Sequence, residues 1–324
     1  MVQRASSTEE KIRTVQERLI GRYDSGHRGP LFICIGAMHG NEPAGVRAIE
    51  LALKMLDVEH IKNPEFTYKG RFTGIIGNLK AFNVDKRFMV KDLNRQFFKE
   101  NIDRIRGSDT LDPEDLELLD LLAFIEAEIA EYNPDKLIIL DLHTTSSFGG
   151  IFTICQDDPK LIETAKGLHA PIVLGITEGL IGTTLHYFTS ENMNVDTTAI
   201  TFESGQHVED KSVNRAIAGI ICMMRELGAV KPEDVENYHE QILISYSKDL
   251  PQLTKLSEHY PIADGDHYVM IPGYKNFQNI NQGELLAHNN GMEVRAATSG
   301  LMLMPLYQSQ GEDGYFIVNE IKTT

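Results

Sequence analysis

The sequence predicts an α/β domain with a largely parallel sheet flanked by helices, followed by a small all-β domain. Two observations support this fold class. As far as residue 227, short apolar runs alternate with amphipathic helical segments, which is the pattern of a parallel sheet. From Tyr260 to Val318, short apolar runs are separated by Asp-Gly, Pro-Gly, Gln-Gly, Asn-Gly and Ser-Gly turns, as in antiparallel β domains. We therefore expect one domain over residues 1–235 and a β-sandwich or barrel-like domain over residues 236–324.

The individual elements follow from local patterns. Residues 1–29 are charged and polar and are predicted to form an N-terminal helical extension. Residues 31–36 form an apolar run after a proline, which indicates a buried strand. Residues 43–56 carry apolar side chains at helical spacing, and a proline followed by acidic residues opens a second helix at Pro113. Further strands are expected over 73–79, 137–142, 151–155, 172–176 and 199–202, and a further helix over 212–227.

Charge and composition exclude several classes of protein. Lys plus Arg number 31 and Asp plus Glu number 47, a net charge of −16, which argues against a nucleic-acid binder or a binder of anionic membranes. No run approaches the roughly 18 uncharged apolar residues of a membrane span. The N-terminus has no apolar signal core. The three cysteines, Cys34, Cys155 and Cys222, are too sparse for a disulfide scaffold. We therefore expect a cytoplasmic protein.

The most informative string begins at Gly36 and reads Gly-Ala-Met-His39-Gly-Asn-Glu42. His39 and Glu42 stand between a predicted buried strand and a predicted helix. At this spacing an imidazole nitrogen and a carboxylate oxygen can converge on one cation. The carboxyl end of a parallel strand is also where α/β sheets place their sites. Taken alone, the pair is better explained as surface polar residues in a glycine-rich loop.

A second string, Asp141-Leu-His143, ends the apolar run over 137–142. His143 therefore emerges at the carboxyl end of a strand, as His39 does. Thr144 to Ser147 follow and favour a polar mouth over a packed core, although a hydrogen-bonded core histidine stays an alternative. His39, Glu42 and His143 together would form a zinc site whose fourth position is open to water, which is the stoichiometry of a catalytic site.

Two further strings offer polar groups for a substrate. In Asp92-Leu-Asn94-Arg95, the guanidinium of Arg95 can bind a carboxylate with two parallel hydrogen bonds, and Asn94 can add an amide donor. Glu203 ends the apolar run over 199–202, where a carboxylate can exchange protons with an activated water and a leaving amine. A solvated loop and a helix-capping glutamate are the alternatives for these two strings.

Taken together, the ordered motifs H-x-x-E, N-x-x-A, D-L-N-R, D-L-H and E-x-G over residues 30–227 resemble the succinylglutamate desuccinylase/aspartoacylase family, a branch of the zinc carboxypeptidase-like fold. The resemblance implies a zinc carboxypeptidase-like sheet with helices on both faces. It also implies that His39, Glu42 and His143 bind one Zn²⁺ per chain, and that Glu203 is the general base and acid.

The resemblance further implies that Asn94 and Arg95 hold the carboxylate of an amino-acid moiety, and that Arg87 matches a basic-aromatic pair before D-L-N-R. The family usually carries Asn-Pro-Arg-Ala where this chain has Asn78-Leu-Lys80-Ala. That arginine helps to polarise the scissile carbonyl. Lys80 keeps the charge but loses the planar fork, so we expect it to substitute only in part. We expect Arg87 or Lys80 to help stabilise the negative charge that develops on the reacting carbonyl oxygen.

A second departure concerns the substrate. Aspartoacylase-like members carry an arginine about ten residues before the catalytic glutamate, and residues 189–196 contain no basic residue here. A dicarboxylic substrate is therefore less favoured. The residues from Lys80 to Arg95 are nevertheless locally basic, which fits a substrate with one carboxylate. His186 and His207 are further candidates for lining the pocket.

The sequence thus predicts a zinc-dependent hydrolase (deacylase) that cleaves the amide bond of a small N-acyl amino acid or related N-acyl amine. The alternatives are a zinc metallocarboxypeptidase acting on short peptides and a non-catalytic ligand-binding relative. A closed pocket capped by the C-terminal domain would favour the deacylase. A homo-oligomer stays an open alternative.

Overall fold

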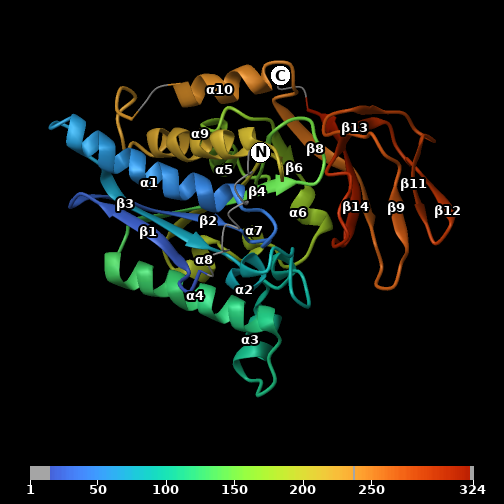
Figure 1. Cartoon of the computed structure of the whole chain (residues 1–324), viewed down its shortest axis with the longest axis horizontal. Helices are drawn as coiled ribbons and strands as arrows, with labels where there is room; N and C mark the ends of the chain where they lie inside the picture. The colour runs from blue at the N-terminus through green and yellow to red at the C-terminus, as the bar shows by residue number, and fades with distance from the viewer. Residues whose placement is uncertain (1–14, 236–237, 322–324) are drawn as a thin grey trace, which may run out of the picture.

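The computed structural model describes residues 15–235 and 238–321, and their backbone builds one large mixed sheet with helices on both faces (Figure 1). In spatial order its strands are β1 (Leu19–Asp24), β3 (Lys69–Ile76), β2 (His27–Gly36), β4 (Lys136–Thr145), β7 (Asp196–Gln206), β5 (Phe152–Ile154), β6 (Ile172–Leu174), β8 (Leu253–Pro261), β14 (Asp313–Glu320), β13 (Gly300–Leu303) and β10 (Asn279–Ile280). Strands β3, β2, β4 and β7 are mutually parallel, so their carboxyl ends meet at one edge. The predicted α/β class is confirmed.

Helices cover the two faces of this sheet in separate layers. One layer holds α1 (Ala44–Lys62), α5 (Pro159–Lys166), α9 (Asp210–Glu226) and α10 (Tyr238–Ser247), and the opposite face carries α3 (Lys99–Arg106) and α4 (Pro113–Tyr132) (Figure 1). Shorter turns of helix lie in the loops: α2 (Leu79–Asn83), the 3₁₀ helix Leu93–Arg95, α6 (Ile176–Gly179), α7 (Thr184–Tyr187) and α8 (Ser190–Met193). Each face has its own cluster of buried apolar side chains. This burial on both faces explains why the central strands read as continuous apolar runs.

The C-terminal strands continue the same sheet. Strand β8 pairs in parallel with β6, and β14, β13 and β10 follow in antiparallel order. A separate antiparallel sheet of β9 (Tyr268–Met270), β11 (Leu285–Asn289) and β12 (Met292–Arg295) shares an apolar cluster with them. Helix α10 packs on α9, so the structural transition to β strands falls after residue 247. The domain division at residue 236 stays a prediction.

The predicted helical extension over residues 1–29 is wrong for its described part. Residues 19–24 form edge strand β1, and β2 begins at residue 27. The helical prediction assumed that the charged side chains of this segment face solvent, but some of them bind buried carboxylates. Arg18 binds the buried Glu117 of α4 at 2.7 Å, and Arg22 binds the buried Glu128 of the same helix. Residues 1–14 lie outside the described part. Among the described residues, no helix is both long and apolar enough to cross a bilayer.

Candidate active site

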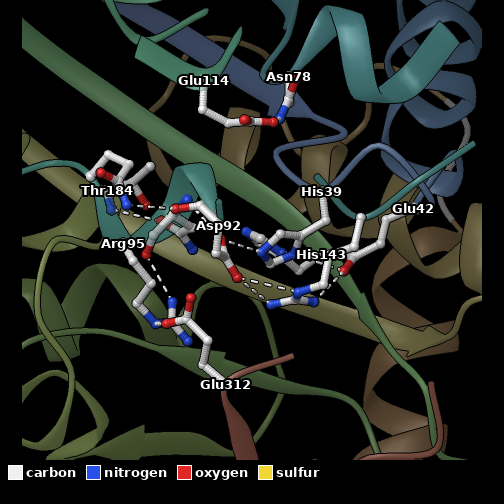
Figure 2. A network of polar contacts seen from close by, with 12 residues as sticks. His39, Glu42, Asn78, Asp92, Arg95, Glu114, His143, Thr184 and Glu312 are labelled. Atoms are coloured by element: carbon white, nitrogen blue, oxygen red, sulfur yellow. Dashed lines mark hydrogen bonds and ion pairs between the residues drawn. The ribbon is translucent and has the colours of Figure 1, made fainter. Parts of the chain in front are cut away.

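Three buried side chains converge at the carboxyl edge of the parallel strands (Figure 2). His39 and Glu42 lie in the loop between β2 and α1, and His143 lies near the end of the adjacent strand β4. Nδ1 of His39 is 2.8 Å from Oε1 of Glu42, and Nδ1 of His143 is 3.3 Å from Oε2. One ligand atom from each residue lies within 4.8 Å of the others. The structure thus brings the three predicted metal ligands together.

The opposite nitrogen of each imidazole faces a second carboxylate. Nε2 of His39 is 3.1 Å from Oδ1 of Asp92, and Nε2 of His143 is 3.0 Å from Oδ2 of Asp141. Both carboxylates are buried. A carboxylate behind each histidine is the usual arrangement around bound metals, because it fixes the ring orientation and increases the basicity of the ligating nitrogen.

The charges of this cluster are strongly coupled. Burial alone would raise the pKa of Glu42, but the imidazoles of His39 and His143 hold it well below its ordinary value. Burial alone would lower the pKa of His143, but Asp141 and Glu42 raise it well above its ordinary value. The cluster therefore favours a carboxylate with positive charge beside it, and a bound cation can supply that charge in place of a proton.

Asp92 organises the loop between β3 and α4. Its carboxylate accepts a hydrogen bond from the backbone N–H of Asn94 at 2.8 Å, which caps the 3₁₀ helix Leu93–Arg95. It also binds Nη2 of Arg87 at 2.8 Å. Burial opposes its ionisation, but His39 and Arg87 hold the pKa of Asp92 well below its ordinary value. The D-L-N-R motif alone predicts no role for Asp92, because its partner His39 lies 53 residues away in the sequence.

Glu203 lies in β7, directly opposite His143 of β4 in the parallel register. It is buried, and its Oε2 atom has no hydrogen-bond partner among the described residues. Burial, with additional repulsion from Glu42 and Asp141, raises the pKa of Glu203 to about 8. A carboxyl group whose pKa lies near neutrality and whose oxygen is unpartnered suits proton transfer.

Arg87 and Lys80, both expected to act on the reacting carbonyl, have different positions. Arg87 lines the cavity around the cluster, and its Nη1 is 3.7 Å from Oε1 of Glu42. Lys80 is exposed on the short helix α2 and is absent from the cavity lining. The structure therefore corrects the catalytic prediction for Lys80. Asn78 points its amide at the buried Glu114, so this part of the motif supports the fold instead.

Glu114 holds the loop that carries the functional motif. Its two carboxylate oxygens accept hydrogen bonds from the backbone N–H groups of Met89 at 2.6 Å, Val90 at 3.0 Å and Lys91 at 3.4 Å. The backbone of residues 89–91 is therefore held against the first turn of α4, where Glu114 lies. This anchoring fixes the backbone between Arg87 and the 3₁₀ helix.

Asn94 and Arg95 both line the cavity, but each already has protein partners. Oδ1 of Asn94 accepts the backbone N–H of Thr184 at 2.9 Å (Figure 2). Arg95 donates through Nη1 to the carbonyl of Asn94 at 2.8 Å and through Nη2 to Asp313 of β14. Its Nε lies 3.9 Å from Glu312. Arg95 is thus tied to the C-terminal part of the chain, and its charge is already paired with that of Asp313.

The C-terminal part of the chain completes the cavity, whose volume is about 110 Å³. His207 also lines it, as expected, with Nδ1 at 2.7 Å from the Thr144 hydroxyl and Nε2 at 3.2 Å from Oε1 of Gln308. His186 does not line it and bonds Thr183 instead. No sequence motif identified the individual C-terminal lining residues, which are Met304, Leu306, Gln308, Gly311, Glu312, Asp313 and Phe316.

Comparison with known proteins decides the family. Residues 28–227 match the sequence profile described as the succinylglutamate desuccinylase/aspartoacylase catalytic domain, which covers more than half of the chain. The chain belongs to the succinylglutamate desuccinylase/aspartoacylase family. The family expected from the motifs is therefore confirmed. Members of this family are deacylases.

Two curated members of the succinylglutamate desuccinylase/aspartoacylase family illustrate the range of similarity. A probable aspartoacylase from Nostoc sp. is 31% identical over 130 residues, which span 40% of this chain and 40% of that protein. A succinylglutamate desuccinylase from Photorhabdus laumondii is 24% identical over 296 residues, which span 82% of this chain and 88% of that one. The first relative is therefore matched over less than half of its length, and the second over most of it.

Two solved structures share the fold of this chain. The succinylglutamate desuccinylase of Vibrio cholerae superposes with a TM-score of 0.64 at 18% identity, covering 92% of this chain and 83% of that one. A product-bound ectoine utilization protein from Ruegeria pomeroyi superposes with a TM-score of 0.60 at 17% identity, covering 91% and 86%. The carboxypeptidase-like fold class predicted from the sequence is therefore confirmed, together with the attached antiparallel sheet.

Proposed function

We propose that this protein is a zinc-dependent deacylase that hydrolyses the amide bond of a small N-acyl amino acid or related N-acyl amine. The observation that carries the proposal is the presence of His39, Glu42, His143 and Glu203 around one cavity. Membership of a deacylase family supports the reaction class.

The residues present fit zinc. Two imidazoles and one carboxylate form the donor set of catalytic zinc sites, which keep one position open. The unpartnered Oε2 of Glu203 beside this cluster supplies the acid and base that such chemistry needs. When bound, zinc lowers the pKa of water toward about 7 and stabilises negative charge on a carbonyl oxygen.

Glu203 performs the proton transfers. In its carboxylate form it accepts a proton from the attacking water, and it then returns that proton to the departing nitrogen. Burial, together with the negative charge of Glu42 and Asp141, raises the pKa of Glu203. A divalent cation held by His39, Glu42 and His143 would offset that negative charge and so favour the carboxylate form. The products are a free acid and an amine.

Other residues orient and stabilise. Asp92 and Asp141 hold the two imidazoles from behind, which fixes their ligating nitrogens. Arg87 presents a guanidinium to the cavity near Glu42, where it can stabilise the negative charge that develops on the amide oxygen. Asp92 in turn holds Arg87 at 2.8 Å, so the metal ligand and the guanidinium share one anchor.

The size of the cavity and its C-terminal wall support a small substrate. Residues between β13 and β14, together with the start of β14, form one of its walls, and its volume is about 110 Å³. A carboxypeptidase needs a groove that admits the chain on the far side of the scissile bond. A non-catalytic role is disfavoured because all three ligands and Glu203 are retained around one cavity.

The proposal is tested by metal loading followed by a substrate screen. The purified full chain is loaded with zinc, its metal content is measured, and N-acetyl, N-succinyl and longer N-acyl amines are incubated with it. We expect one Zn²⁺ per chain and release of free amine from at least one compound. Absence of release from every compound, with zinc bound, would overturn the proposed function.

A further inference from the structure

The basic side chains that line the cavity already have acidic partners. Arg87 donates from Nη2 and Nε to Asp92, at 2.8 and 3.2 Å. Arg95 hydrogen-bonds through Nη1 to Asn94 and through Nη2 to Asp313, and its charge is thereby paired with the Asp313 carboxylate. Within the described part of the chain, the cavity therefore offers no unpaired guanidinium or ammonium to a substrate carboxylate.

The pairing of Arg95 with Asp313 is a fixed feature of the fold. Asp313 begins strand β14, and its other oxygen, Oδ1, lies 2.7 Å from Nε2 of His259 on the neighbouring strand β8. The ring of His259 stacks on Phe316 with centroids 4.6 Å apart. The carboxylate is thus held from two sides by a packed sheet, so we do not expect a substrate to displace it from Arg95.

Glu312, next to Asp313, has no side-chain hydrogen bond among the described residues. It lines the cavity, and its side chain is 50% exposed. Among the described residues its carboxylate contacts only Nε of Arg95, at 3.9 Å, which is beyond hydrogen-bond distance. Figure 2 shows it beside Arg95, apart from the cluster of His39, Glu42 and His143. Burial, with repulsion from Asp92 and Asp313, raises the pKa of Glu312 in spite of the attraction of Arg95 and Arg87.

We propose that Glu312 selects the substrate by binding a positively charged amino group, so that the substrate is an N-acyl diamine, an N-acylated compound with a second, free amine and no carboxylate. This inference rests on the proposed deacylase function and gives it a substrate class. It replaces the sequence-based expectation that Arg95 binds a substrate carboxylate. An ammonium group placed at Glu312 would restore local charge balance and form a charge-assisted hydrogen bond.

The test compares three ligands of matched length: N-acetylputrescine, which is cationic, N-pentylacetamide, which is neutral, and 5-acetamidopentanoate, which is anionic. Their binding to the zinc-loaded Glu203→Gln variant is measured by calorimetry at low ionic strength, where charge effects are least screened. We expect the cation to bind tighter than the neutral analogue by roughly tenfold or more. Adding Glu312→Gln should remove this preference, and adding Glu312→Lys should shift it toward the anion.

Glu191→Gln is the matched control, because Glu191 is exposed on α8 and does not line the cavity. It should leave the order of affinities unchanged. Equal binding of the three ligands, or a cation preference that survives Glu312→Gln, would overturn the inference. Binding of none of them would overturn it as well.

Amine release by the zinc-loaded wild-type chain is measured in parallel and separates the two proposals. A Glu312-dependent cation preference without turnover of any compound would refute the deacylase function and leave the role of Glu312 supported. Turnover of the neutral and anionic compounds that equals turnover of the cation would support the deacylase and refute the role of Glu312.

Discussion

His143 and Glu203 lie directly opposite each other on the adjacent parallel strands β4 and β7. One is a metal-ligand candidate and the other is the proposed acid and base. Their separation is therefore set by the hydrogen-bond ladder of the central sheet and does not depend on a loop. A site built on strands holds its groups more rigidly than one built on loops.

The first prediction concerns Glu203→Gln. The amide keeps the size of the side chain but cannot accept a proton, so turnover should fall by several orders of magnitude, roughly 10³-fold or more. The three ligands are untouched, so bound zinc should stay at one per chain. Kinetics of amine release and metal analysis on the same sample check both parts. Wild-type activity in this variant would refute the assignment of Glu203.

The second prediction concerns the carboxylate behind His39. Asp92→Asn removes the charge that orients the imidazole, so zinc affinity should fall about 10–100-fold. The zinc affinity of each variant is measured by competition with a chromophoric chelator. Asp85→Asn is the matched control, since Asp85 is exposed at a positive φ of 52° that asparagine also tolerates. Equal affinities for the two variants would show that Asp92 does not support the ligand.

The third prediction explains the glycine in His-Gly-Asn-Glu. Gly40 donates its N–H to the carbonyl of Arg87 at 3.1 Å, and a Cβ at Gly40 would lie 2.2 Å from the carbonyl carbon of Ala81. Because that neighbour is backbone, Gly40→Ala should destabilise the fold by about 1–3 kcal/mol and weaken zinc binding. Chemical unfolding and the chelator competition check the two effects.

Gly107→Ala is the control for that substitution. Gly107 caps α3 with a negative φ of −100°, and the nearest atom to an added Cβ there would be 3.7 Å away. This change should stay within about 0.5 kcal/mol of the wild type. A Gly40→Ala variant as stable as Gly107→Ala would mean that the loop relaxes without cost.

The parts of the site that could be predicted are those that depend on short, continuous sequence patterns. His39 and His143 each follow an apolar run, and a parallel sheet brings the carboxyl ends of such runs together. The apolar runs and their predicted parallel pairing therefore indicate that these ligands lie close together. Glu203 follows by the same reasoning, because its strand pairs with that of His143.

The parts that could not be predicted depend on pairings between distant segments. Arg95 and Asp313 are 218 residues apart in the sequence, and no pattern near Arg95 predicts that it pairs with Asp313. The same limit produced the error over residues 19–24, whose strand is stabilised by pairing with β3 and by buried partners on α4. Lys80 was misplaced because a motif fixes the order of residues but not which side of a short helix faces the cavity.

The last prediction concerns the pH dependence of stability through Asp313. Burial opposes its ionisation, but His259 and Arg95 outweigh burial and hold the pKa of Asp313 below its ordinary value. A carboxyl whose pKa is lower in the folded than in the unfolded chain stabilises the fold above its unfolded pKa, about 3.9, and loses that contribution as pH falls through the folded value. Wild type should therefore be more stable than Asp313→Asn at about pH 5, and the difference should shrink below about pH 4. Urea unfolding of both proteins across this range measures the difference, with Asp249→Asn, at an exposed position, as the control. A difference that stays constant down to about pH 3 would show that Asp313 is not ionised by its pairing with Arg95 and His259.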